Sequence, residues 1–161
     1  MRRAACHPSA APRVRGHALA LCGALLVAGC GWFGPPRTAL REVSVIATSA
    51  ANNGGATWLD LVFVYDAASA AALPRTAPDW FAHRRDLLLS FGPKIEAVPV
   101  QLPTNQTLAP VALPASTRRA LTVYCYVNFV APAGQGVADL TQYKRVRITL
   151  APNTVTYDAT P

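Results

Sequence analysis

Cysteine and histidine are the side chains of this sequence that could act as nucleophiles or as metal ligands. A nucleophilic site pairs a thiol or hydroxyl with a base, and a structural zinc site gathers four such ligands. The 161 residues include Cys6, Cys22, Cys30, Cys125, His7, His17 and His83. Five of these seven lie within the first 30 positions, so the chemistry of the N-terminal stretch decides what remains elsewhere.

The stretch before Cys30 has the three parts of an export signal. Its cationic residues are Arg2, Arg3, Arg13 and Arg15. Residues 18–27 are apolar but shorter than the roughly 20 residues that span a bilayer, and Ala28 and Gly29 are small. The pattern resembles a bacterial lipoprotein signal, in which the Cys30 thiol carries a diacylglycerol and Cys30 becomes the first residue after cleavage.

This interpretation divides the chain into a signal peptide at 1–29, a lipidated tether at 30–41 and a domain at 42–161. Several acyl chains are needed for stable anchoring, because a single chain binds membranes only marginally. Lipoproteins of this type typically receive three chains. Gly31 follows the cysteine, where an Asp commonly retains Gram-negative lipoproteins at the inner membrane. We therefore predict a lipid anchor at the periplasmic face of the outer membrane.

Few chemically active residues remain after cleavage. Cys125 is then the single thiol besides Cys30, which rules out an intramolecular disulfide, and His83 is the single histidine. Asp79 and Asp86 lie on one predicted helix, where helix capping and surface charge explain them. We predict no catalytic residue, no metal site and no cofactor other than the covalent lipid on Cys30, and hence no enzyme activity.

The net charge of +7 is misleading, because four of the fifteen Lys and Arg residues precede Cys30 and none of the eight acidic residues does. The part from Cys30 onward therefore carries only about +3. Such a weak excess gives no reason to expect nucleic-acid binding.

Alternation of apolar and polar residues predicts β-strands through most of the domain. The clearest strand covers residues 119–130, where Cys125 falls in an apolar row and is predicted to lie in the core. The other strands are expected at residues 43–47, 58–65, 95–102, 107–113, 145–150 and 154–157. About seven strands with a short helical insert predict an all-β fold, a two-sheet β-sandwich.

The segments between the strands differ in character. Residues 49–57 contain Asn and Gly and are too long for a tight hairpin turn, so we expect an exposed, adaptable loop. Residues 76–91 are predicted to form the helical insert, and their spacing predicts that Trp80 and Phe81 pack on a sheet. Residues 133–142 form a second loop, with a short helical turn expected at 137–140.

Four features together resemble a known family. They are the lipoprotein signal ending at Cys30, the strand at 59–65, the helical segment with Asp79, Trp80 and Phe81, and the strand at 121–127. In this order they resemble the outer-membrane lipoproteins of type VI secretion systems, the TssJ (SciN) family. The resemblance implies a transthyretin-like β-sandwich that tethers the periplasmic domain of an inner-membrane TssM-type protein to the outer membrane.

In that family the loop between the first two strands makes much of the contact with the partner. This loop maps onto residues 49–57 here. The resemblance therefore implies that the partner-binding residues are Ser49, Asn52, Asn53, Gly54 and Gly55.

Two alternatives stay open at the level of sequence. One is a periplasm-facing lipoprotein that binds a small ligand or glycan through Trp58, Tyr124 and Tyr126, of which the two tyrosines share a strand face. The other is an assembly or pilot lipoprotein of a different envelope machine.

Overall fold

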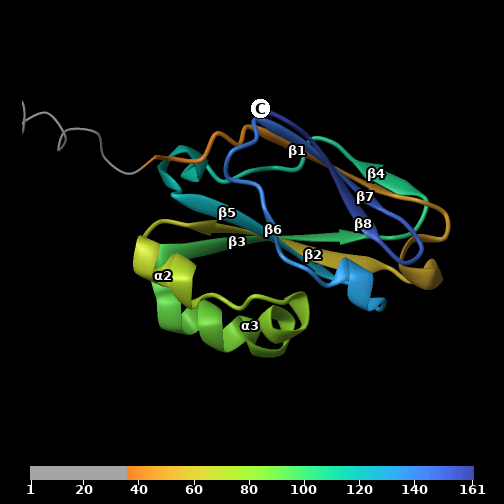
Figure 1. The fold of residues 1–161 in the computed structure, drawn as a ribbon, viewed down its shortest axis with the longest axis horizontal. Helices are drawn as coiled ribbons and strands as arrows, with labels where there is room; N and C mark the ends of the chain where they lie inside the picture. The colour runs from red at the N-terminus through yellow and green to blue at the C-terminus, as the bar shows by residue number, and fades with distance from the viewer. Residues whose placement is uncertain (1–35) are drawn as a thin grey trace, which may run out of the picture. The chain divides into compact units, whose positions relative to one another are not determined.

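Two four-stranded sheets form the framework of the protein (Figure 1). The structure, a computed structural model, describes residues 36–161, and the predicted signal peptide and Cys30 lie outside this range. The first sheet has the strand order β4-β1-β7-β8 and the second the order β3-β2-β5-β6. Neighbouring strands are antiparallel except for β1 and β7. None of the helices in residues 36–161 is both long and apolar enough to cross a bilayer.

Most of the elements lie where the sequence pattern predicts them. The strands are β1 (Glu42–Ala47), β2 (Thr57–Val64), β3 (Ile95–Leu102), β4 (Gln106–Leu108), β5 (Thr122–Asn128), β6 (Ala138–Asp139), β7 (Arg145–Leu150) and β8 (Val155–Thr160). The α-helices are α2 (Ala67–Ala72) and α3 (Ala77–Phe91). Short 3-10 helices are η1 (Ala51–Gly54), η2 (Gly92–Lys94), η3 (Thr117–Arg119) and η4 (Pro132–Gly134).

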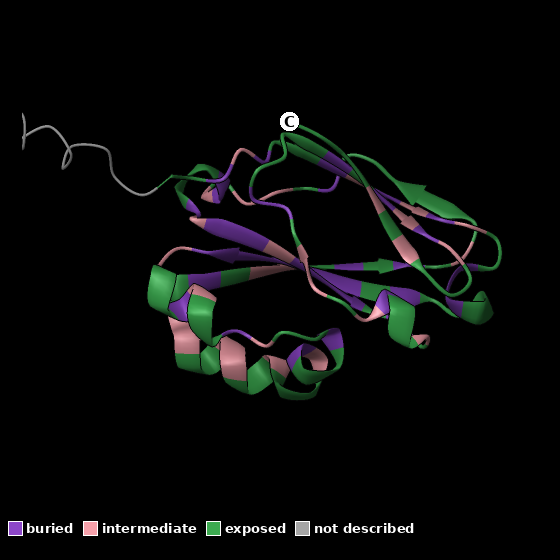
Figure 2. Ribbon diagram, in the orientation of Figure 1, coloured by how far each residue is buried: buried purple, intermediate pink, exposed green. Residues whose placement is uncertain are grey.

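The main core lies between the two sheets, because alternate residues of each strand point inward. Figure 2 shows the resulting bands of buried residues along the strands. In β5 the inward row includes Val123, Cys125 and Val127, all fully buried, as the sequence pattern predicts. The two-sheet β-sandwich expected from the sequence is confirmed.

Helices α2 and α3 cover the outer face of the β3-β2-β5-β6 sheet (Figure 1). Each begins with a side-chain cap, since Asp66 and Thr76 accept hydrogen bonds from the backbone N–H groups of Ser69 and Asp79. Trp80 is fully buried and packs against the sheet in a second core with Val62. The predicted packing of Trp80 is therefore confirmed.

Two details differ from the sequence expectations. There are eight strands rather than about seven, because residues 138–139 pair with β5 where a helical turn was expected. Strand β4 is only three residues long, since prolines at 110 and 114 interrupt the remainder of the expected strand.

The start of the domain also differs from the expected boundary at residue 42. Thr38 and Leu40 are buried, and the backbone N–H of Thr38 donates to the carbonyl of Ala120 at 2.9 Å. The N–H of Ala39 donates to the carbonyl of Thr141 at 2.8 Å. Residues 38–41, assigned to the tether from sequence, are thus part of the sandwich.

Candidate functional site

One end of the sandwich is formed by four connections, and we call it the loop end. It consists of residues 48–58, 101–107, 128–136 and 151–156, and the β1–β2 connection lies at the right in Figure 1. The register brings these segments together, because Ala47 pairs with Leu150 and Gln106, and Trp58 pairs with Gln101 and Asn128. The described chain enters at the other end, through residues 36–41.

The β1–β2 connection has a specific backbone shape. Three successive residues, Asn52, Asn53 and Gly54, have positive φ angles of 49°, 55° and 83°. Asparagine and glycine tolerate this left-handed conformation better than other residues. The Asn-Asn-Gly sequence therefore produces a defined turn within η1.

Asn52 attaches this turn to the rest of the loop end. Its side chain is only 6% exposed, and its Oδ1 accepts a hydrogen bond from the N–H of Val130 at 2.8 Å. Its Nδ2 donates to the carbonyl of Asn128 at 3.5 Å, and its backbone N–H donates to the carbonyl of Ala151 at 3.1 Å. Asn52 thus positions the turn rather than presenting itself to solvent.

The remaining predicted contact residues are accessible. Ser49, Asn53, Gly54 and Gly55 are all exposed, as expected for this loop. The expectation of an exposed loop is wrong for Asn52, because the amide group satisfies the backbone groups at the end of β5.

Trp58 is an exposed aromatic residue beside this turn. It lies on the helix-covered face of β2, in the same row as Asp60 and Val62, so alternation predicts that a helix covers it. Instead it is 53% exposed, while Asp60 and Val62 are buried. Val130, on the adjacent connection, is 69% exposed. Strand periodicity gives no signal for where the helical cover stops, so it could not separate Trp58 from its buried neighbours.

A hollow of about 340 Å³ adjoins Trp58. Its lining includes Arg84 of α3 together with Pro99 and Gln101 of β3. Trp58 therefore lies between the turn and a concave surface, which gives the loop end both a projecting and a recessed part.

Helix α3 is fixed beside Trp58 by a buried carboxylate. Asp60 Oδ2 accepts hydrogen bonds from Trp80 Nε1 at 2.8 Å and from Arg84 Nε at 2.5 Å. The Trp80 ring stacks on Tyr126 with 4.8 Å between ring centroids. Asp60 is almost completely buried, so these two donors compensate for the loss of its hydration.

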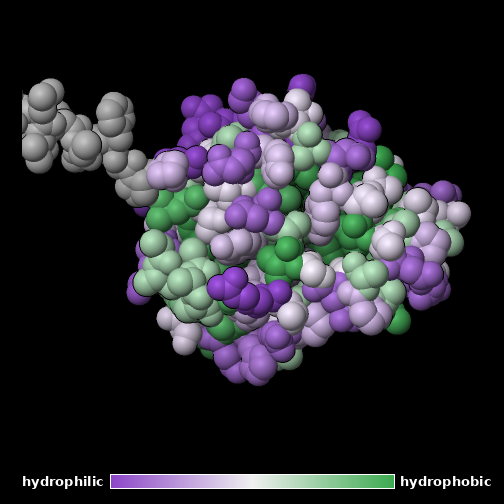
Figure 3. Space-filling view, in the orientation of Figure 1, coloured by the Kyte–Doolittle hydropathy of each residue, from purple (hydrophilic) through white to green (hydrophobic). Residues whose placement is uncertain are grey.

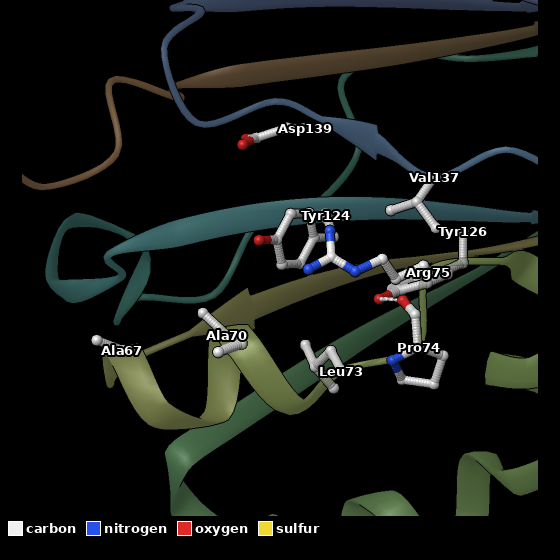
Figure 4. A pocket seen from close by; sticks show the side chains of 10 residues that line it. Ala67, Ala70, Leu73, Pro74, Arg75, Tyr124, Tyr126, Val137 and Asp139 are labelled. Carbon is white, nitrogen blue, oxygen red and sulfur yellow. Dashed lines mark hydrogen bonds between the residues drawn. The ribbon is translucent and has the colours of Figure 1, made fainter.

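The aromatic residues of the ligand-binding alternative do not form one platform. Tyr126 is buried beneath Trp80, and its hydroxyl donates to the carbonyl of Pro74 at 2.8 Å (Figure 4). Tyr124 meets it edge to face, at 6.4 Å between centroids, and is half-buried. Both tyrosines line an open hollow of about 470 Å³ with Arg75, and Trp58 lines a different one.

The other candidate chemical groups are dispersed. Burial raises the pKa of the Cys125 thiol to about 12, which keeps it protonated near neutral pH. His83 is exposed on α3, and the Asp79 carboxylate accepts a hydrogen bond from the hydroxyl of Thr76, the N-cap residue of the same helix. Among residues 36–161, no three or more His, Cys, Asp or Glu side chains gather in a group that could hold a metal ion. Cys30, the predicted lipidation site, lies outside these residues.

Comparison with solved structures identifies the fold. No protein-family model and no curated protein sequence matches the chain. The T6SS lipoprotein TssJ1 from Pseudomonas aeruginosa superposes with a TM-score of 0.55 and 14% identity, over 79% of this chain and 98% of that one. Serratia marcescens Lip, a membrane-bound component of the type VI secretion system, gives a TM-score of 0.51 and 10% identity, over 73% and 94%.

A structure of the T6SS protein TssM C-terminal domain from EAEC also matches. Its TM-score is 0.53 and its identity 16%, over 73% of this chain and 98% of the matched chain. The protein thus has a TssJ-like β-sandwich fold, and the fold implied by the family resemblance is confirmed.

Proposed function

We propose that this chain is an envelope lipoprotein of a type VI secretion membrane complex. In this proposal a lipid on Cys30 anchors it to the outer membrane, and the loop end binds the periplasmic domain of an inner-membrane TssM-type protein. The TssJ-like fold and the lipoprotein signal support the proposal. The observation that carries it is an exposed Trp58 beside a well-defined turn, at the end opposite to the entering chain.

The loop end has the properties of a protein-binding surface. Exposed tryptophan is enriched among the residues that dominate interface energies, and Trp58 lies beside a hollow that a partner side chain could fill. Asn52 holds the turn in place through both its side chain and its backbone. A turn that is already ordered loses less conformational entropy when a partner binds.

Attachment at two ends explains how the protein could work without catalysis. A lipid at one end and a protein contact at the other confine both attachments to the same small volume. Each then raises the effective concentration of the other, and the joint attachment is stronger than either alone. The proposed function is therefore mechanical linkage between two membranes.

Replacing the lipidated thiol tests the anchor. In Cys30→Ser the nucleophile for the diacylglycerol is absent, so we expect the protein to leave the outer-membrane fraction and secretion by the system to stop. Cys125→Ser is the matched control, because its thiol is buried far from any lipid and should leave fractionation unchanged. Normal secretion with Cys30→Ser would refute the proposed tether.

A further inference from the structure

The end of the sandwich opposite to the loop end is rich in positive charge, and we call it the basic end. Its cationic residues are Arg37, Arg41, Lys94, Arg118, Arg119, Lys144 and Arg145. All seven are exposed. By contrast, the four segments of the loop end contain no Asp, Glu, Lys or Arg. In the described part of the chain, charge is therefore distributed unevenly along the strand direction, with positive charge at the basic end and no charged side chains at the loop end.

Backbone hydrogen bonds show that these residues share one end. The N–H of Arg41 donates to the carbonyl of Lys144 at 2.9 Å, and the N–H of Lys144 donates to the carbonyl of Thr160 at 2.9 Å. Arg37 Nη1 donates to the carbonyl of Arg119, which joins the entering chain to η3. The N–H of Tyr65 donates to the carbonyl of Lys94 at 2.9 Å, which places the start of β3 nearby.

The positive charges of the basic end have little local compensation. Among the described residues 36–161 there is one salt bridge. It joins Arg84 to Asp60 and lies away from this end. Three acidic residues, Glu42, Asp66 and Glu96, lie at the basic end, and Asp139 and Asp158 lie slightly further along their strands. Asp66 caps α2, and Glu96 accepts hydrogen bonds from the hydroxyls of Tyr65 and Ser116. Asp158 is opposite Arg147, so the wider count is eight cations against five anions, which leaves a net positive surface.

We propose that the basic end rests on the anionic phospholipid headgroups of the membrane that anchors the protein. The inference rests on the proposed lipid anchor for its location, because residues 31–35 alone separate Cys30 from the described domain. Six Cα–Cα steps from Cys30 to Pro36 span at most about 22 Å, so an anchored Cys30 holds this end close to the headgroups. Charges interact with a membrane surface over a Debye length of about 8 Å, which makes such proximity necessary.

This contact orients the domain. Lysine and arginine near an anionic leaflet are attracted to it, whereas the uncharged loop end is not. Hydrophilic side chains are prominent along the upper rim of the molecule, where the strands of the β4-β1-β7-β8 sheet run (Figure 3). With the basic end on the membrane, the loop end projects away from the surface and faces a partner arriving from the periplasm.

Vesicle flotation tests the proposal without requiring the lipid. The protein used begins at residue 30 and carries Cys30→Ser, and the vesicles contain phosphatidylcholine alone or mixed with phosphatidylglycerol. At low ionic strength we expect binding to be tighter by roughly tenfold or more when phosphatidylglycerol is present. This difference should disappear at about 0.5 M salt, where screening is strong.

Charge reversal at two exposed sites locates the effect. Arg118→Glu with Lys144→Glu should abolish the preference for phosphatidylglycerol. Arg75→Glu with Arg85→Glu changes the net charge equally on the helical side and should retain it. Equal loss in both variants, or no preference in the unmodified domain, would overturn the proposal. Milder Gln substitutions at positions 118 and 144 should give a partial loss, and thermal unfolding checks that each variant is folded.

The two proposals fail in different experiments. If Cys30→Ser secretes normally while the vesicle preference is present, the tether is wrong and the basic surface stands. If the tether is confirmed but the vesicles show no charge preference, the basic end does not bind lipid.

Discussion

Trp58 is exposed because the helices that cover its strand face do not extend as far as this residue. Its strand position predicts coverage by a helix, yet more than half of its surface is exposed beside the β1–β2 turn. Asn52 illustrates the reverse, since its type and loop position predict exposure, yet it is buried and bonded to β5. In the proposed function, Trp58 makes partner contact, and Asn52 positions the loop.

Trp58→Ala should weaken binding to the periplasmic domain of the TssM-type protein. Truncating a central aromatic residue of an interface costs about 2 kcal/mol or more, which is roughly thirtyfold in Kd. Isothermal titration calorimetry measures the effect. Leu89→Ala is the matched control, because Leu89 is 72% exposed on α3 and should leave the affinity unchanged. An unchanged Kd for Trp58→Ala would remove Trp58 from the interface.

Asn52→Ala should lower the free energy of unfolding by about 1 kcal/mol more than Asn53→Ala does, because the Val130 N–H loses its acceptor in a part-buried environment. Both residues have positive φ, but the Asn53 side chain is exposed, so the comparison isolates the side-chain hydrogen bonds. Urea unfolding followed by circular dichroism measures the difference. Equal destabilisation by the two variants would show that backbone conformation alone matters.

At the scale of elements, the attachment of α3 depends on one carboxylate. Asp60 accepts from both Trp80 and Arg84, and both donors come from the same helix. The helix also packs through the stack of Trp80 on Tyr126. Loss of the carboxylate would therefore affect the position of α3 and the hollow beside Trp58.

Asp60→Ala should destabilise the fold by about 3 kcal/mol or more, because it leaves a partly buried guanidinium and a buried indole N–H without their acceptor. Arg84→Met should also destabilise the fold strongly, because the almost completely buried Asp60 carboxylate then keeps only the neutral indole donor of Trp80. Thermal and urea unfolding of the two variants measure both losses. Unchanged stability in either variant would contradict this assignment.

Strand β5 shows how far periodicity could predict the fold. Its apolar row was evident in the sequence and Cys125 is indeed buried, because one face must fill the core. Strand β6 could not be predicted, since a two-residue strand contains no periodicity. Residues 38–41 were assigned to the tether because their burial depends on bonds to Ala120 and Thr141, which are distant in sequence.

The candidate site was predictable only in part for the same reason. The β1–β2 connection was evident as an Asn- and Gly-rich loop, and four of its five proposed contact residues are exposed. The contribution of Val130 depends on a connection 78 residues after Asn52, and the fold brings the two together through a hydrogen bond. Contacts between distant segments are not visible in a local pattern.

At the scale of the whole molecule, the two ends of the sandwich have opposite character. One end carries seven exposed cations, and the other is uncharged and exposes Trp58 and Val130. This division matches a protein that faces a membrane with one end and a protein partner with the other. The strands between them hold the two surfaces apart.

Hydrogen–deuterium exchange tests the central claim, that the loop end is the partner-binding surface. Exchange is measured for the chain alone and with the periplasmic domain of the TssM-type protein. We expect binding to slow exchange in residues 48–58 and 128–136, with residues 36–41 and 117–119 unchanged. Slower exchange at the basic end, with the loop end unchanged, would contradict the account.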